Sequence, residues 1–299
     1  MSQNPKMETL TDQTFVRKCI IKFIQDLENK FSIKVIFACE GGSRGWGTHT
    51  DDSDYDVRGI YILSEDQYMS VTKSKGIISG FSQKIPETNV LFDYIFIDFR
   101  KFLKRNIINE KNQLNFILQS KTWYINKFPE DILSELKIKL PVPLRGIKGH
   151  LNDLTKQVKN AQKISPKQAL NCFIYGLQLI HIYVFDSFPF YSSQDQIEFL
   201  QNQISQNKDN LNIGQQQNVQ LERIFEEFKI DLILEKFKQY LELKKHNQQS
   251  IPEQDNLIIQ NFSQDVMNYK YDIKMQSITS SQLDQIFRKM VSYNEQYEE

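Results

Sequence analysis

Apolar residues in the N-terminal part of the chain recur first at helical spacing and then in short continuous runs. The helical spacing extends from Phe15 to Leu27 after Thr11, and it predicts an amphipathic helix with Thr11 as its cap. Three runs rich in β-branched and aromatic residues predict buried strands at residues 33–39, 55–63 and 90–97. Helix and strands in this order predict a layer in which helices pack on a sheet.

The pattern changes after Pro129, where the apolar residues return to long helical periods. The sequence therefore predicts an α/β (α+β) fold, with a sheet and flanking helices in residues 1–128 and an all-helical domain in residues 129–299. The polar residues 201–220, rich in Gln and Asn, predict a linker or loop within the second domain. Helices are expected at residues 144–162, 166–185, 194–203, 221–245 and 280–295.

Charge is balanced over the whole chain but uneven along it. The 37 Lys and Arg residues equal the 37 Asp and Glu residues, so the chain as a whole has no excess charge that would attract nucleic acid. Residues 137–167, however, contain a run of basic residues against Asp153 alone, and both a solvated helix face and a binding site for RNA fit this pattern. The basic residues are Lys137, Lys139, Arg145, Lys148, Lys156, Lys159, Lys163 and Lys167.

Cysteine usage and the N-terminal sequence bear on the compartment. The 3 cysteines are too few and too scattered for a disulfide framework, which predicts a reducing environment. The N-terminus lacks a basic stretch followed by an apolar one, and polar side chains interrupt the apolar residues 172–185. We therefore expect an intracellular protein without a membrane span, in the cytoplasm or alternatively in the nucleus.

Two aspartates at the start of the second predicted strand are the first candidates for chemistry. Asp54 and Asp56 alternate along the strand, so both carboxylates lie on the same face while Tyr55 and Val57 face the other side. Two carboxylates this close repel each other unless a cation lies between them, and hard oxygen ligands suit Mg²⁺. An Asp-rich solvated turn is the alternative interpretation of this segment.

A glycine turn upstream of these aspartates strengthens the prediction of a metal site. Gly41, Gly42 and Ser43 follow the first predicted strand, where glycine lets the backbone approach a ligand and helix N–H groups can bind phosphate. A phosphate site beside a metal site is what the handling of a nucleoside triphosphate (NTP) requires.

The third predicted strand offers one more carboxylate. Asp93 lies among apolar residues, where an unpaired charge is costly, so a third metal ligand is a reason for its presence. Asp98 precedes a predicted helix and is better explained as the cap of that helix.

At this point a resemblance to a known family becomes clear. Residues 38–62, ACEGGSRGWGTHTDDSDYDVRGIYI, resemble the signature of the predicted nucleotidyltransferases of the DNA polymerase beta superfamily, in the bacterial and phage branch linked to RNA repair. That branch has an ACESGSRAWG-like stretch followed by SDYDVR. The resemblance continues at DYIFIDFRK, residues 93–101, and is fainter at residues 109–118, where Asn115 replaces a Glu of the family.

The resemblance implies roles for particular residues. Gly42 and Ser43 would bind the triphosphate, and Asp54, Asp56 and Asp93 would hold two Mg²⁺ ions, with Mn²⁺ as a substitute. Arg44 would contact a phosphate, although an ion pair with Glu40 is an equal alternative. Trp46 is expected to be a core aromatic residue.

The function implied is the transfer of a nucleoside monophosphate from an NTP to an acceptor hydroxyl, such as an RNA end, with release of pyrophosphate. Two alternatives stay open: nucleotidylation of a protein or small molecule, and an inactive scaffold subunit with the same fold. His181 lies on a predicted helix and is expected to be packed, and Cys39 is expected to be buried and inert.

Overall fold

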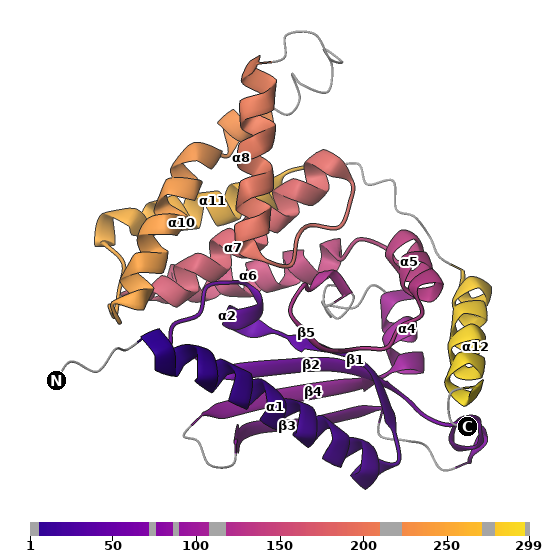
Figure 1. The fold of residues 1–299 in the computed structure, drawn as a ribbon. Helices are drawn as coiled ribbons and strands as arrows, with labels where there is room; N and C mark the ends of the chain where they lie inside the picture. Colours follow the sequence, from indigo (N-terminus) through magenta and orange to yellow (C-terminus); the bar gives the residue numbers. More distant parts are fainter. Residues whose placement is uncertain are drawn as a thin grey trace, which may run out of the picture.

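The computed structural model describes residues 6–71, 76–85, 90–107, 118–209, 223–270 and 279–296. A sheet with helices on both faces forms one part of the molecule, and a group of packed helices forms another (Figure 1). The predicted fold class is confirmed: this is a mixed α+β architecture with a helical C-terminal region.

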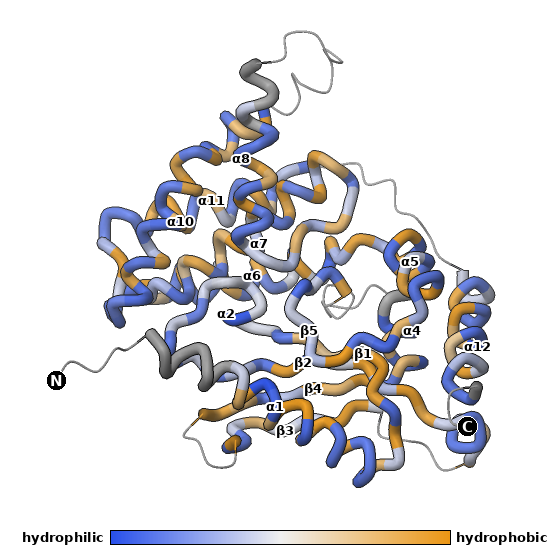
Figure 2. The backbone as a smooth tube through the Cα atoms, in the orientation of Figure 1, coloured by the Kyte–Doolittle hydropathy of each residue, from blue (hydrophilic) through white to orange (hydrophobic). Residues whose placement is uncertain are grey.

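The sheet has 5 strands in the order β3-β4-β2-β1-β5. Among the described strands, β2 and β4 are the only parallel neighbours, whereas β1–β2, β1–β5 and β3–β4 are antiparallel pairs. Figure 2 shows that β1, β2 and β4 are largely hydrophobic, as expected for central strands covered on both faces. The strands are β1 (Lys34–Glu40), β2 (Tyr55–Ile62), β3 (Ile77–Lys84), β4 (Leu91–Asp98) and β5 (Trp123–Asn126).

Three of these strands were predicted and two were not. The sequence does not predict β3, because most of its residues are exposed at the edge of the sheet and no apolar alternation marks it. β5 has only 4 residues and forms the other edge, where pairing with β1 defines it. Both segments form strands because they pair with a neighbouring strand, and their own sequences carry no clear strand pattern.

Helix α1 (Lys6–Phe31) crosses one face of the sheet (Figure 1). Its residues Val16, Ile20 and Ile24 pack with sheet residues such as Val57 and Phe96. The predicted cap is wrong, because α1 begins at Lys6 and Thr11 lies inside the helix.

Three helices, the last of them near the C-terminus, cover the face of the sheet opposite to α1. α4 (Phe99–Ile107), α5 (Glu130–Lys139) and α12 (Ser280–Gln296) share one core with sheet residues Ile36 and Ile60. The short helices α2 (Gly42–Gly45) and α3 (Glu65–Met69) each follow a strand of the sheet.

The remaining helices form a second core around α7 (Pro166–Phe185). Ser165 and Gln168 form a capping box at its start, and Asp186 ends it in the left-handed conformation. α7 is long and apolar enough to cross a membrane by length and composition, but 78% of its apolar window is buried inside the protein, as in a core helix. The helices around it are α6 (Leu144–Asn160), α8 (Ser193–Asp209), α10 (Ile230–Lys245) and α11 (Asn256–Asn268).

The predicted helices agree closely with α6, α7 and α12. The predicted helix 221–245 is interrupted at residues 228–229, before α10, and α5 and α11 were not predicted. The predicted linker at residues 201–220 is wrong in its first part, because α8 continues to Asp209. Residues 210–220, like residues 109–117 with Asn115, lie outside the described residues. The boundary between residues 128 and 129 stays a prediction, and α5 and α12 pack on the sheet rather than on the second core.

Candidate active site

Two aspartates lie side by side on the neighbouring parallel strands β2 and β4. Asp56 and Asp93 are paired in register, and strands in a sheet lie about 4.8 Å apart. Val57 belongs to the core beneath α1, so Asp56 projects from the opposite face of β2. Asp54 is exposed and directly precedes the strand, and its charge acts on Asp56 two residues further.

The three carboxylates act on one another electrostatically. Burial raises the pKa of Asp56 above its ordinary value, and the charges of Asp54 and Asp93 raise it further. The guanidinium of Arg58 opposes this, because its Nη2 lies 2.6 Å from Oδ1 of Asp56. Asp56 therefore has a cation beside it already, supplied by the next residue on the same face of β2.

The turn between β1 and α2 fits closely over Asp56. Gly42 has φ of +53°, and a Cβ at this position would lie 1.8 Å from Oδ2 of Asp56. The N–H of Gly41 donates to the carbonyl of Asp56 at 2.5 Å. Gly42 is thus required both for its left-handed conformation and for the space that the carboxylate occupies.

Glu40 at the end of β1 binds the backbone of β2 at Asp56, a role that the sequence analysis did not assign. The side chain is 3% exposed, and its Oε1 accepts the N–H of Asp56 at 2.9 Å. Its Oε2 accepts the hydroxyl of Tyr124 on β5. Burial raises the pKa of Glu40 to about 7, and these hydrogen bonds oppose the rise. The sequence signal for this role was a carboxylate at the end of an apolar strand. The role could not be derived from it, because both hydrogen-bond partners lie on other strands.

Arg44 is engaged by the backbone rather than by Glu40. Its guanidinium donates to the carbonyls of Asp51, Ser53 and Asp54 at 2.8 to 3.3 Å. It also lies over the ring of Tyr55, with Cζ 4.0 Å from the ring centre. These contacts fix the turn that leads into β2, so the ion pair with Glu40 is not the arrangement found, and the phosphate contact stays a prediction.

Asp93 and Asp98 on β4 have different surroundings. Oδ1 of Asp93 accepts the N–H of Ser82 at 2.6 Å, and the residue is partly exposed. Asp98 is 2% exposed and accepts the N–H of Lys101 at 2.9 Å, which confirms its interpretation as the cap of α4. Across the described residues, no group of three His, Cys, Asp or Glu side chains is closely enough arranged to form a ready metal site.

The second core contacts the glycine turn directly. Ser193 at the start of α8 donates to the carbonyl of Trp46 through its N–H at 3.0 Å and through its hydroxyl at 2.5 Å. The Trp46 ring packs edge-on against Tyr175 of α7, as expected for a core aromatic residue. Lys244 at the end of α10 donates to the carbonyl of Thr48 at 2.5 Å. Nothing local in the sequence connects these residues to the turn.

The other candidates from the sequence are structural. Cys39 is fully buried, and burial raises the pKa of its thiol far above the ordinary value. His181 is 3% exposed and hydrogen-bonded to Ser187 and Gln196, so both predictions of packed residues are confirmed.

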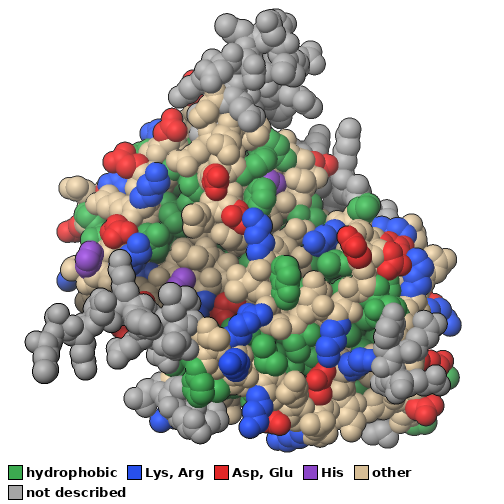
Figure 3. All heavy atoms as spheres, viewed as in Figure 1, with side chains coloured by type: hydrophobic (Ala, Val, Ile, Leu, Met, Phe, Trp, Pro, Cys, Tyr) green, Lys and Arg blue, Asp and Glu red, His purple; other side chains and the backbone are tan. Residues whose placement is uncertain are grey.

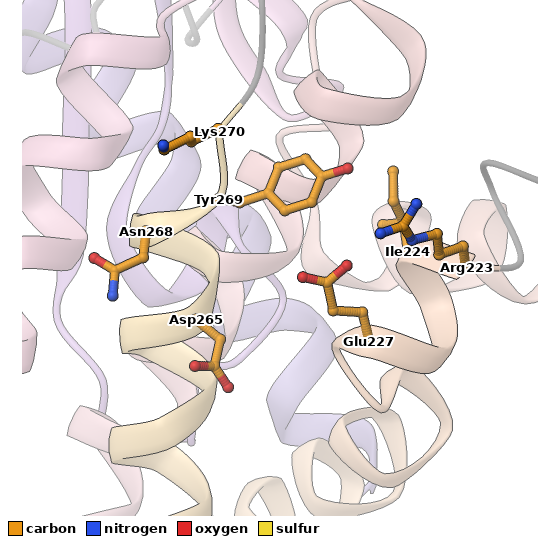
Figure 4. A pocket seen from close by; sticks show the side chains of 7 residues that line it. All are labelled: Arg223, Ile224, Glu227, Asp265, Asn268, Tyr269 and Lys270. Carbon is orange, nitrogen blue, oxygen red and sulfur yellow. The ribbon is translucent and has the colours of Figure 1, made fainter.

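A hollow of about 790 Å³ lies elsewhere, in the helical region (Figure 4). Glu227 and Asp265 face it from two helices, beside the ring of Tyr269. Its charges are mixed, since Arg223 and Lys270 also line it. None of the predicted site residues takes part in it.

A mixed five-stranded sheet with a glycine turn over paired aspartates is consistent with the polymerase beta-like nucleotidyltransferases as a class. Residues 16–104 match the family described as RNA repair pathway DNA polymerase beta family, which confirms the resemblance for this part of the chain. The match supports a nucleotidyltransferase-type function.

A relative, the Uncharacterized protein YcgL of Bacillus subtilis (strain 168), is 36% identical over 63 residues. The aligned part is 21% of this chain and 24% of that protein, so the similarity spans about a quarter of the relative's length.

Proposed function

We propose that this protein transfers a nucleoside monophosphate from an NTP to an acceptor hydroxyl at an RNA end, with release of pyrophosphate. The observation that supports this most directly is the pairing of Asp56 with Asp93 in register, beneath the turn made by Gly42. This arrangement combines negative charge for metal ions with backbone that a phosphate can approach.

The residues that would hold two Mg²⁺ ions, or Mn²⁺ in their place, are carboxylates, whose hard oxygen atoms are ligands of the kind that these ions prefer. Asp54, Asp56 and Asp93 offer carboxylate oxygens near one another. Burial is the main cause of the raised pKa of Asp56, and the charges of Asp54 and Asp93, which a cation would offset, add to it. When bound, the ions would activate the acceptor hydroxyl and stabilise the charge on the leaving pyrophosphate. Asp56 would exchange Arg58 for this partner.

The chain itself would position the substrates. Gly42 allows the backbone to approach the triphosphate, and Ser43 would add its hydroxyl as a hydrogen-bond donor. Glu40 fixes the N–H of Asp56, and Arg44 fixes the turn that carries Asp54. Asp93 would lie nearest to the acceptor oxygen. Positioning and charge stabilisation are the main requirements of phosphoryl-group chemistry.

The basic segment at residues 137–167 is the proposed contact for RNA. Three of its basic residues are exposed: Arg145, Lys156 and Lys163. Lys139 instead forms an ion pair, with its Nζ 2.5 Å from Oε1 of Glu135. On the face shown in Figure 3, basic and acidic side chains are interspersed, which favours a local contact with RNA over a general attraction of RNA to the protein surface. RNA affinity that falls steeply with salt would support this contact, and a flat dependence would contradict it.

The test is incubation of the protein with Mg²⁺, each α-labelled NTP and short RNAs, followed by separation of labelled RNA, protein and pyrophosphate. Asp93→Asn is the informative variant, because Asn can still accept the N–H of Ser82 while the charge is lost. We expect transfer to fall on the order of 10²-fold or more. Asp52→Asn in the exposed turn is the matched control and should retain activity.

Each result has a distinct meaning. Label in RNA that depends on Asp93 supports the proposal. Label in protein would instead favour protein nucleotidylation, and full activity of Asp93→Asn would contradict the proposed metal site. An absence of label with every NTP would favour an inactive scaffold.

A further inference from the structure

The edge strand β3 is irregular directly beside Asp93. Its register with β4 shifts between Gly80 and Gln83. The two residues in between, Phe81 and Ser82, therefore lie opposite Asp93 alone. Two residues against one form a β-bulge, a feature that is common next to active sites, where it redirects a side chain.

The bulge has a strained backbone that hydrogen bonds hold in place. Ser82 has a φ of +51°, in the left-handed region that residues with a Cβ rarely adopt. Its N–H donates to Oδ1 of Asp93 at 2.6 Å, and the side-chain amide of Gln83 donates to the carbonyl of Phe81 at 2.9 Å. Strain that the surroundings maintain in this way is typical of functional sites.

The bulge presents an aromatic ring on the same face of the sheet as Asp93. A Cβ at Gly80 would meet the ring of Tyr94, which packs against the core beneath α1. Side chains alternate along a strand, so Phe81 follows Gly80 on the opposite face, as Asp93 precedes Tyr94 there. The side chain of Phe81 is 62% exposed.

Two further side chains extend this surface. Leu91 is 45% exposed and lies two residues before Asp93 on β4, on the same face. Its partner in register on β3 is Lys84, which is also exposed. We call Phe81, Lys84 and Leu91 the bulge surface. An exposed aromatic ring with a cation nearby is how proteins bind single-stranded nucleic acid, because a base stacks on the ring and the cation binds a phosphate.

The position of the bulge surface favours the acceptor over the NTP as its ligand. The strands β2 and β4, which carry Asp56 and Asp93, lie between β1 and β3 (Figure 1). The glycine turn follows β1, so the bulge surface is on the other side of the two aspartates. It lies one strand spacing, about 4.8 Å, from Asp93, the residue proposed to be nearest to the acceptor oxygen.

We propose that the bulge surface binds the unpaired end of an RNA acceptor, with a base stacked on Phe81 and a phosphate bound by Lys84. This inference rests on the proposed nucleotidyl transfer and names the form of the acceptor, a single-stranded RNA end. The competing occupant is a protein segment that pairs with the open edge of β3.

The first experiment measures binding of a fluorescein-labelled short single-stranded RNA by fluorescence anisotropy, without NTP. We expect Phe81→Ala to weaken binding about tenfold, which is in the range of one stacked base. Phe81→Trp should retain the affinity, since it keeps an aromatic ring. The matched control is Phe31→Ala, because Phe31 is an exposed phenylalanine at the end of α1, and its replacement should not change RNA binding.

Lys84→Gln tests the phosphate contact. It should reduce the slope of log affinity against log salt by about 1. A blunt RNA duplex should bind less well than the single strand, because its terminal bases are already paired. In the transfer reaction, Phe81→Ala should raise KM for RNA and leave KM for the NTP unchanged.

The outcomes separate this inference from the proposed function. If the wild-type protein binds single-stranded RNA and Phe81→Ala binds it equally well, the inference is wrong while the proposed function stands. If Phe81→Ala raises KM for the NTP as much as KM for RNA, the role of Phe81 is structural and the inference is wrong. Label transferred to protein, and lost in Phe81→Ala, would make a protein the occupant of the bulge surface. If the wild-type protein neither binds RNA nor labels it, both proposals are wrong.

Discussion

Gly42 shows how a single residue decides the geometry of the site. Its positive φ is one that glycine adopts without strain, and its missing Cβ leaves room for the carboxylate of Asp56. Gly47, five residues further, also has a positive φ, of +75°, but a Cβ there would meet nothing within 4 Å. A substitution at Gly47 therefore introduces backbone strain alone, whereas a substitution at Gly42 introduces strain and a clash with Asp56.

We expect Gly42→Ala and Gly47→Ala to cost a similar backbone strain of about 1 kcal/mol, measured as free energy of unfolding in urea. Only Gly42→Ala should also displace Asp56 and lower nucleotidyl transfer strongly, on the order of 10²-fold. Equal activities of the two variants would show that Asp56 can move without loss of function.

At the scale of the element, α7 is joined to the chain after it through His181. The amide oxygen of Gln196 accepts the N–H of Phe190, so its NH₂ group faces Nδ1 of His181 at 3.1 Å. Nδ1 must therefore accept, and the proton of the neutral ring lies on Nε2, which donates to Ser187. Burial lowers the pKa of His181 to about 4, in agreement with a neutral ring.

This arrangement predicts a loss of stability in acid. The folded-state pKa is below the unfolded value of about 6.5, so the contribution of His181 is complete above pH 6.5 and is lost as the pH falls towards 4. Between pH 7.5 and pH 5 the free energy of unfolding should fall by about 2 kcal/mol from this residue. His181→Gln should reduce the pH dependence, whereas replacement of the exposed His246 by Gln should not. The same slope in His181→Gln would contradict the assignment.

Over the whole molecule, the last described helix completes the core of the sheet. Ile286 of α12 is fully buried together with Phe99 of α4 and Leu136 of α5. Lys289 of α12 also forms an ion pair with Glu135 of α5 at 2.9 Å. The stability of the N-terminal layer therefore depends on residues near the other end of the chain.

Ile286→Ala should consequently lower the free energy of unfolding by about 2–5 kcal/mol, as is typical of a buried isoleucine. Leu257→Ala on α11 is the control, since that side chain is 62% exposed, and it should change the value by less than about 0.5 kcal/mol. Thermal unfolding with and without ATP would show whether the loss also reaches the site. A small effect of Ile286→Ala would mean that α12 is only loosely attached.

The sequence by itself determined the three central strands, most of the long helices and the residues around the glycine turn. Each of these has a local signal, such as an apolar run, a helical period, or glycine and aspartate at fixed spacing, as at Gly42 and Asp56. The edge strands β3 and β5, the engagement of Arg44 by carbonyls and the approach of Lys244 to Thr48 were decided only by the tertiary structure. The physical reason is that these features depend on partners elsewhere in the chain. Edge strands need a neighbour for their hydrogen bonds, and Lys244 reaches Thr48 only because folding brings α10 against the loop after α2.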